Sequence, residues 1–190
     1  MTGYRLAHNR NFSHDDQVND SSDSGFESAA EAADPGSVSR SQFRIAHFRI
    51  EGELGSGGNG HVYKAFDESL NRYVAIKIIR PEIAQNPKVV QSFRNEASAA
   101  ARINHPNVVQ IHFVGDEEGR LYIVMEWLQG MDLEDILAKR GKLSETEVIP
   151  LALQAARGLQ AGHQLGLIHG DIKPANLFMD DHHGLKILDF

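Results

Sequence analysis

Apolar and polar residues alternate in short segments between residues 48 and 126, and a period of two predicts strands. The predicted strands cover residues 48–52, 61–66, 73–79, 108–114 and 121–126. One helical pattern interrupts them at residues 88–103, where the apolar stripe consists of Val89, Phe93, Ala97 and Ala100. These patterns together predict a five-stranded, largely antiparallel unit with one inserted helix.

The pattern becomes mainly helical after Gly130, with helices predicted at residues 132–140 and 144–163. Ser144 and Glu147 have the spacing of a capping box, which supports the start of the second helix. Pro150 lacks a backbone donor and predicts a kink or a later start. The predicted apolar face of this helix is Val148, Leu151, Ala152, Ala155 and Leu159, and short strands follow at residues 177–179 and 185–188. The fold class is therefore α+β.

Residues 1–45 show no hydrophobic period, and they are rich in Ser and Asp. Such a segment buries too little apolar surface to offset its ordering entropy, so a disordered tail is predicted. Composition adds mainly exclusions. The net charge is −7, which argues against a nucleic-acid surface, and without Cys there is no disulfide or thiolate zinc site. No run approaches the ~20 apolar residues of a membrane span, and the first ten residues lack an apolar stretch, so no secretory signal is expected there.

A cluster of glycines at residues 55–60 contains the pattern G-x-G-x-x-G. Three interpretations compete: a hairpin turn, a dinucleotide-binding fingerprint, and a strand–loop–strand lid over nucleotide phosphates. The fingerprint requires a helix after the last glycine, whereas residues 61–66 alternate as a strand does. The dinucleotide interpretation is therefore disfavoured. In a lid, the glycines would let backbone N–H groups approach phosphate oxygens.

Charged residues downstream supply the parts of a phosphoryl-transfer site. Lys77 lies among apolar residues of a predicted strand, and Glu96 in the next helix could pair with it. Asp171, Lys173 and Asn176 occur within the segment HGDIKPAN, and Asp189 follows eighteen residues after Asp171. Taken singly, Lys77 is most simply a strand-end lysine that snorkels to solvent, and the loop carboxylates are most simply solvated. Phosphoryl transfer, however, requires a carboxylate for the attacking hydroxyl, an Asp and an Asn for Mg²⁺, and a lysine for phosphate charge.

These motifs, in this order, resemble those of a protein kinase domain over residues 48–190. The segment 54–84, LGSGGNGHVYKAFDESLNRYVAIKIIRPEIA, is similar to the eukaryotic-like Ser/Thr kinases of bacteria. The resemblance implies a protein-kinase-like α+β fold with an N-lobe at residues 48–126. A hinge and a partial, mainly helical C-lobe would follow at residues 127–190. The implied function is transfer of phosphate from Mg-ATP to a Ser or Thr hydroxyl of a protein.

The resemblance also implies a role for individual residues. Lys77 matches the lysine of the α- and β-phosphates, and Glu96 matches its ion-pair partner. Met125 matches the gatekeeper, and the backbones of Glu126 and Leu128 match the hinge groups that bind adenine. The remaining implied nucleotide contacts are Leu54, Gly55, Ser56, Gly57, Gly58, Asn59, Gly60, His61 and Val62 around the loop, Ala75 and Phe178 against the base, and Asp132 at the ribose.

The implied catalytic residues are Asp171, which accepts the proton of the substrate hydroxyl, Lys173 at the γ-phosphate, and Asn176. Asn176 and Asp189 match the Mg²⁺ ligands, so the implied cofactors are ATP and Mg²⁺. The implied partners are protein substrates with a Ser or Thr acceptor. His169 is interpreted as a packed scaffold residue, and a metal site at His182 and His183 is disfavoured because no spaced partner ligands accompany them.

Two features depart from the family pattern. Gly170 replaces the usual arginine, which pairs with a phosphate on the activation loop, so activity is expected not to depend on that contact. The sequence ends after Asp189-Phe190, before the expected glycine, which predicts a truncated domain. The alternatives are therefore a nucleotide-binding regulatory or interaction module, or an inactive truncated kinase. A cytoplasmic location is expected, although the resemblance allows a membrane span beyond Phe190.

Overall fold

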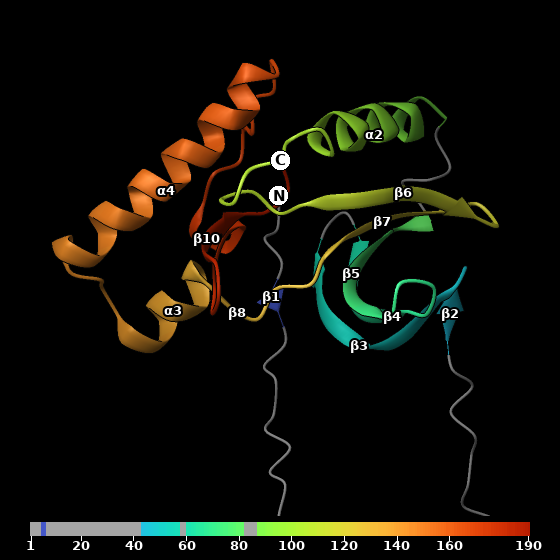
Figure 1. The fold of residues 1–190 in the computed structure, drawn as a ribbon, viewed down its shortest axis with the longest axis horizontal. Coiled ribbons are helices and arrows are strands. Elements are labelled where there is room, and N and C mark those ends of the chain that lie inside the picture. The colour runs from blue at the N-terminus through green and yellow to red at the C-terminus, as the bar shows by residue number, and fades with distance from the viewer. Residues whose placement is uncertain (1–4, 7–42, 58–59, 82–86) are drawn as a thin grey trace, which may run out of the picture.

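The computed structural model describes residues 5–6, 43–57, 60–81 and 87–190 (Figure 1). Most of the predicted tail at residues 1–45 lies outside these described residues. Within its last part, β2 (Arg44–Ile45) pairs with the following strand, and Ile45 is only 1% exposed. The packed part of the chain therefore includes residues a few positions earlier than the sequence pattern predicts.

A curled, seven-stranded antiparallel sheet forms the first part of the fold, on the right in Figure 1. Its main strands are β3 (Phe48–Gly57), β4 (Gly60–Asp67), β5 (Arg72–Ile79), β7 (Arg120–Glu126) and β6 (Ile111–Glu117), in that spatial order. The short strand β1 (Arg5–Leu6) pairs with the outer edge of β3. The predicted antiparallel unit is therefore confirmed, with β1 and β2 added to it.

One face of this sheet carries its hydrophobic core. Phe48, Val74, Ile76, Tyr122 and Val124 are among the residues that pack together there, all nearly inaccessible to solvent. The strict alternation along β5 puts Val74 and Ile76 on this face and Tyr73, Ala75 and Lys77 on the other. The opposite face of β5 is therefore the one that carries the candidate site.

Helix α2 (Pro87–Ala100) lies beside β6 (Figure 1) and ends three residues earlier than predicted. Ala97 and Ala100 are buried as expected, whereas Val89 is 40% exposed, so its place in the apolar stripe is wrong. The helix contacts the sheet at β6, and its two buried residues, Ala97 and Ala100, both lie in its C-terminal half. The first turn of the helix therefore has little to bury its valine against.

The second part of the fold contains two helices and a small sheet, on the left in Figure 1. Its elements are β8 (Gly130–Asp132), α3 (Leu133–Arg140), α4 (Glu145–Gln164), the 3-10 turn η1 (Pro174–Asn176), β9 (Leu177–Asp180) and β10 (Gly184–Ile187). The strands form an antiparallel sheet in the order β10–β9–β8. Among the described residues, no helix combines the length and apolar character needed to cross a membrane.

Helix α4 packs one face against β10, and the sequence pattern identifies this face only in part. Ala155 is buried and Leu151 and Leu159 are partly buried, but Val148 is 44% exposed and Ala152 is also exposed. Gly158 and Gly162 are buried instead, where α4 lies close to Ile187 and Phe190. The helix also runs through Pro150 rather than starting after it, so a later start is wrong.

The predicted capping box is present at the start of α4. The backbone N–H and the hydroxyl of Ser144 both donate to Glu147, as does Arg140. These bonds, with the Ser144 backbone bond the largest contribution, lower the pKa of Glu147 from its ordinary value of 4.5 to about 2. Because the folded-state pKa is depressed, this stabilisation is complete above pH 4.5 and is lost as the pH falls toward 2.

Glu147→Gln is therefore expected to reduce the loss of stability between pH 4.5 and pH 2. The measurement is the thermal unfolding midpoint as a function of pH, for wild type and variant. Glu145→Gln is a matched control, since it is also acidic and in the first turn of α4. Parallel pH profiles for wild type and Glu147→Gln would contradict the role assigned to the capping box.

Candidate active site

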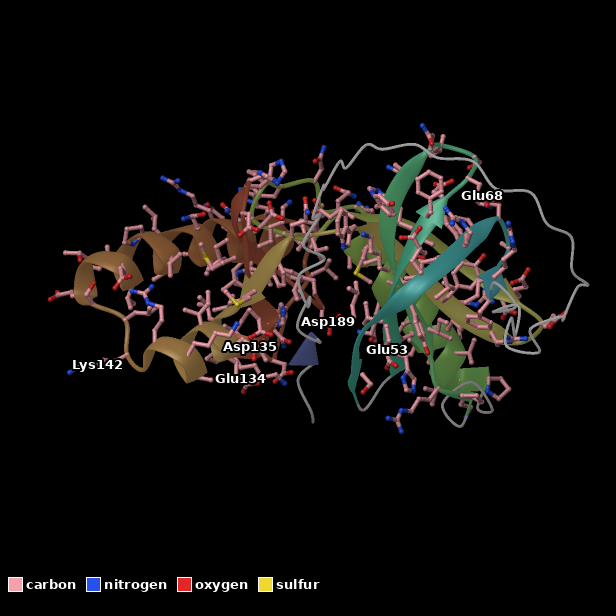
Figure 2. All side chains as sticks on the ribbon, turned by 90° about the horizontal axis from the view of Figure 1, so that it is seen from below. Glu53, Glu68, Glu134, Asp135, Lys142 and Asp189 are labelled. Carbon is pink, nitrogen blue, oxygen red and sulfur yellow. The ribbon has the colours of Figure 1, made fainter. Side chains whose placement is uncertain are left out.

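Lys77 on β5 and Asp189 near the end of the chain form an ion pair between the two parts of the fold. Lys77 Nζ lies 2.7 Å from Asp189 Oδ1, and the Lys77 side chain is only 7% exposed. Figure 2 shows Asp189 where the helical part meets the curled sheet. A buried ammonium needs a charged partner, and the partner here is a carboxylate 112 residues away in sequence. The two predicted phosphate- and metal-binding residues are therefore in direct contact.

The loop at residues 169–176 brings the three predicted catalytic side chains together. Lys173 Nζ donates to Asp171 Oδ2 at 2.7 Å, and Asn176 Nδ2 donates to the Asp171 carbonyl at 2.8 Å. The hydrogen bond from Lys173 lowers the pKa of Asp171, and Asn176 adds to this effect. The Asp171 side chain is half exposed. Asp171 is therefore an ionised carboxylate that remains open to solvent.

Backbone and ring contacts hold this loop against the end of the chain. The Leu188 N–H donates to the Asn176 carbonyl at 2.9 Å, and His169 Nε2 contacts the Leu188 carbonyl at 2.8 Å. The His169 ring also meets the Phe190 ring edge-on, with centroids 5.1 Å apart. His169 is thus a scaffold residue, as expected. These contacts place Asp189, between Leu188 and Phe190, beside the loop.

Asp189 adopts a left-handed backbone conformation, with φ of 53°. Aspartate is one of the few residues other than glycine that tolerate this region. The turn lets the backbone on either side of Asp189 serve the scaffold while the carboxylate reaches Lys77. Such strain is common where a functional side chain must be aimed in one direction.

Gly162 on α4 makes room for the ring of Phe190. A Cβ atom built on Gly162 would lie 2.1 Å from Phe190 Cζ, which is impossible without movement. Gly162→Ala is therefore expected to lower the free energy of unfolding by about 1–3 kcal/mol, the usual cost of overpacking. Thermal or denaturant unfolding would measure this cost.

The double variant Gly162→Ala with Phe190→Leu separates steric conflict from other effects. The smaller ring-free side chain should recover part of the lost stability, because the conflict is with the far end of the phenylalanine ring. If Gly162→Ala is as stable as wild type or more so, helix propensity outweighs the contact and the packing interpretation fails.

The glycine-rich segment forms a hairpin between β3 and β4, as the lid interpretation requires. Gly55 pairs with Val62, Ser56 with His61, and Gly57 with Gly60. Gly58 and Asn59 lie outside the described residues. A Cβ on Gly60 would lie 2.0 Å from the Ile78 carbonyl oxygen, so this glycine is also required for strand packing.

A small apolar cluster lies on the same face of the sheet as Lys77. Val62 and Ala75 are buried there, with Leu54 and Met125 packed against them. Val62 and Ala75 are predicted to lie against a nucleotide base, Met125 is the predicted gatekeeper, and Leu54 is a predicted nucleotide contact of the glycine-rich loop. Phe178, the third residue predicted to lie against the base, is on β9 of the other sheet, is 2% exposed, and is in register with Asp132.

The hinge that follows Met125 is fixed by contacts that the sequence interpretation missed. The Glu126 N–H donates to the Gln110 carbonyl, so its own carbonyl is the one backbone group that Glu126 could offer to a base. Its carboxylate accepts from Lys186 Nζ at 2.8 Å and from the Gln110 N–H at 2.7 Å. Lys186 is a lysine within an otherwise apolar strand, and that pattern was a usable signal of a buried partner.

Two predicted side chains have other contacts in the structure. Asp132 is 2% exposed, and its carboxylate caps α3 by accepting from the Asp135 N–H at 2.8 Å. Burial raises the pKa of Asp132. Glu96 is exposed and accepts a hydrogen bond from Ser92 at 2.8 Å. The ribose contact of Asp132 and the pairing of Glu96 with Lys77 therefore stay predictions, and the burial of Asp132 favours its role as a helix cap.

Comparison with known proteins agrees with this arrangement. The family model for the protein kinase domain matches residues 48–190. A probable serine/threonine-protein kinase of Clostridium acetobutylicum is 41% identical over 143 residues, which cover 75% of this chain and 22% of that protein. The serine/threonine-protein kinase PknA of Mycobacterium tuberculosis is 36% identical over 148 residues, covering 75% of this chain and 34% of PknA.

The structural comparison gives the same result. The crystal structure of the PknI kinase domain from Mycobacterium tuberculosis superposes with a TM-score of 0.71 and 29% sequence identity. The match covers 79% of this chain and 62% of that domain. The chain therefore spans about a third or less of the length of the two kinases and 62% of the PknI kinase domain.

Proposed function

Because the chain belongs to the protein kinase domain family, we propose that it carries the ATP and Mg²⁺ site of a Ser/Thr protein kinase. Its residues 48–126 would be the N-lobe, and residues 127–190 the hinge and the first part of the C-lobe. The observation that carries the proposal is the convergence of Asp171, Lys173, Asn176 and the Lys77–Asp189 pair at one place.

The nucleotide would lie between the glycine-rich hairpin and the second sheet. Val62, Ala75, Leu54 and Met125 offer an apolar surface for a base, next to the hinge backbone. The backbone N–H groups of the glycine-rich hairpin and the Lys77 ammonium would then face the phosphates. The overall acidity of the chain does not oppose this, because the charges that meet the phosphates are local.

The donor set fits a Mg²⁺ ion. Asn176 and Asp189 offer amide and carboxylate oxygens, which are hard ligands of the type that Mg²⁺ prefers. Asn176 is 3% exposed and donates through Nδ2 to Asp171, so its Oδ1 is the atom available to a cation. Mg²⁺ is usually held by one or two such side chains together with phosphates and water. When bound, the ion would neutralise charge on the transferred phosphoryl group.

The chain's own residues would then perform the transfer. A Ser or Thr hydroxyl oxygen forms a bond to the γ-phosphorus as the bond from that phosphorus to the bridging oxygen of ADP breaks. The hydroxyl proton passes to Asp171, which is ionised and half exposed and can therefore meet an incoming side chain. Lys173, already at Asp171, would contact the γ-phosphate and stabilise its charge.

Gly170 bears on how such an enzyme would be regulated. It has φ of +74°, and nothing lies within 4 Å of the position of a Cβ. A glycine cannot supply the guanidinium that binds a phosphorylated loop in many relatives. We therefore propose that activity does not require that contact.

The direct test is phosphoryl transfer from ATP to a Ser/Thr protein substrate, with wild type compared against Asp171→Asn. Activity in wild type that is lost in the variant would support the proposal. ATP binding without transfer in either protein would support the alternative, a nucleotide-binding module. Absence of ATP binding would contradict the proposed site as a whole.

A further inference from the structure

A ladder of aromatic rings and cations runs across the sheet and ends at the hinge. Lys64 Nζ lies 4.1 Å from the ring centroid of Tyr73 and 4.0 Å from that of Trp127. The Tyr73 and Trp127 centroids are 5.2 Å apart, and Phe66 meets Tyr73 edge-on at 5.2 Å. Arg49 lies over Phe66 at 5.3 Å at the far end of the ladder. The Lys64 ammonium is thus held between two rings.

The register of the sheet places this contact beside the candidate base site. Lys64 pairs with Ala75 across β4 and β5, and Val62, two residues before Lys64, lies on the same face. Tyr73 precedes Ala75 by two residues and shares that face as well. The contact between Lys64 and Tyr73 therefore lies directly beside the apolar cluster of Val62 and Ala75, on the same face of the sheet.

Trp127 connects the contact to the hinge. It stands between Glu126 and Leu128, the two residues whose backbones are proposed to bind the base. Among the described residues, Lys64 forms no ion pair with a carboxylate, and its ammonium contacts the rings of Tyr73 and Trp127. A cation over an aromatic face is attracted by the ring quadrupole, more strongly where water is partly excluded. Lys64, Tyr73 and Trp127 are each at least partly open to solvent, which keeps the expected effect modest.

We propose that Lys64 is a positioning residue for the hinge. Its ammonium, held between the rings of Tyr73 and Trp127, ties the hinge backbone to β4 and β5 and so fixes the groups that bind adenine. The inference rests on the proposed function, because it assigns Lys64 a part in ATP binding. Lys64 itself does not contact the nucleotide and acts through Trp127.

The test compares substitutions that remove or keep the positive charge. Lys64→Met keeps the aliphatic stem and removes the cation, Lys64→Arg retains a cation, and Arg49→Met removes the cation at the end of the ladder away from the hinge. Trp127 is the only tryptophan in the chain, so the tryptophan fluorescence comes from this position of the hinge. The readouts are acrylamide quenching of Trp127, ATP affinity by calorimetry with Mg²⁺, and the thermal midpoint.

Lys64→Met is expected to bind ATP roughly three- to fivefold more weakly than wild type, with greater quenching of Trp127. Lys64→Arg should recover most of the affinity, and Arg49→Met should bind as wild type does. In a catalytically active protein, the change should appear in KM for ATP rather than in kcat. If Lys64→Met fails to fold, Tyr73→Leu removes one ring of the pair and should weaken ATP binding in the same direction.

Unchanged ATP affinity in Lys64→Met overturns the proposal, whether or not the quenching changes. Equal loss of affinity in Lys64→Met and Arg49→Met also overturns it, because the effect would then belong to the whole ladder. A wild-type chain that binds no ATP contradicts the proposed function instead. In that case acrylamide quenching of Trp127 still tests the contact. Equal quenching in wild type and Lys64→Met would show that Lys64 does not hold the hinge.

Discussion

Asp171→Asn is expected to lower the rate of phosphoryl transfer by about 10²–10⁴-fold, the usual contribution of a positioned acid–base group. The asparagine has nearly the shape of aspartate but cannot accept the hydroxyl proton. Asn176 donates mainly to the backbone carbonyl of residue 171, at 2.8 Å, so that bond survives the substitution. ATP affinity should therefore change by less than about threefold, because the lost group acts on the substrate hydroxyl.

The measurement is single-turnover transfer from ATP to a Ser/Thr substrate, alongside ATP affinity by calorimetry. Asp181→Asn is a matched control, since Asp181 is an exposed aspartate of the same part of the fold. The control should retain wild-type activity. If Asp171→Asn transfers phosphate within tenfold of wild type, Asp171 is not the group that accepts the proton.

The strands and most helices could be predicted from the sequence because burial on one face imposes a simple period. Val74 and Ile76 alternate with Tyr73, Ala75 and Lys77, and the structure buries the first pair in the main core. The stripe on α2 and the face of α4 were only partly correct. Val89 and Val148 are exposed, since the period identifies a possible buried face but not whether another element covers it.

Some contacts of the candidate site could be predicted from the sequence and others could not. Asp171, Lys173 and Asn176 are close in sequence, and their meeting follows from one short loop. The Lys77–Asp189 contact was not predicted as such, because it depends on how the two sheets are placed relative to each other. The Lys186–Glu126 pair, 60 residues apart in sequence, depends on the same placement, whereas the cap that Asp132 provides to α3 is a local contact between residues three apart. A single sequence carries spacing along the chain and no direct record of such distant pairs.

Lys77→Met is expected to reduce phosphoryl transfer by about 10²–10³-fold, in the range found when one electrostatic group is removed from an active site. Two effects combine. The ammonium that would face the phosphates is lost, and Asp189 loses the cation 2.7 Å from its carboxylate. An Asp189 side chain without this partner has no fixed direction from which to hold Mg²⁺. Both ATP affinity and the transfer rate should therefore fall, which distinguishes this variant from Asp171→Asn.

Comparison of Lys77→Met, Asp189→Asn and the double variant measures the coupling between these residues. If the ion pair aims Asp189, the two single losses should sum to more than the loss in the double variant, because each removes part of the same arrangement. Lys142→Met is the control, since Figure 2 shows Lys142 at the far end of the helical part from Asp189. Strictly additive losses would mean that Lys77 and Asp189 act on the nucleotide independently. Near-normal ATP binding in Lys77→Met would exclude Lys77 from the phosphate site altogether.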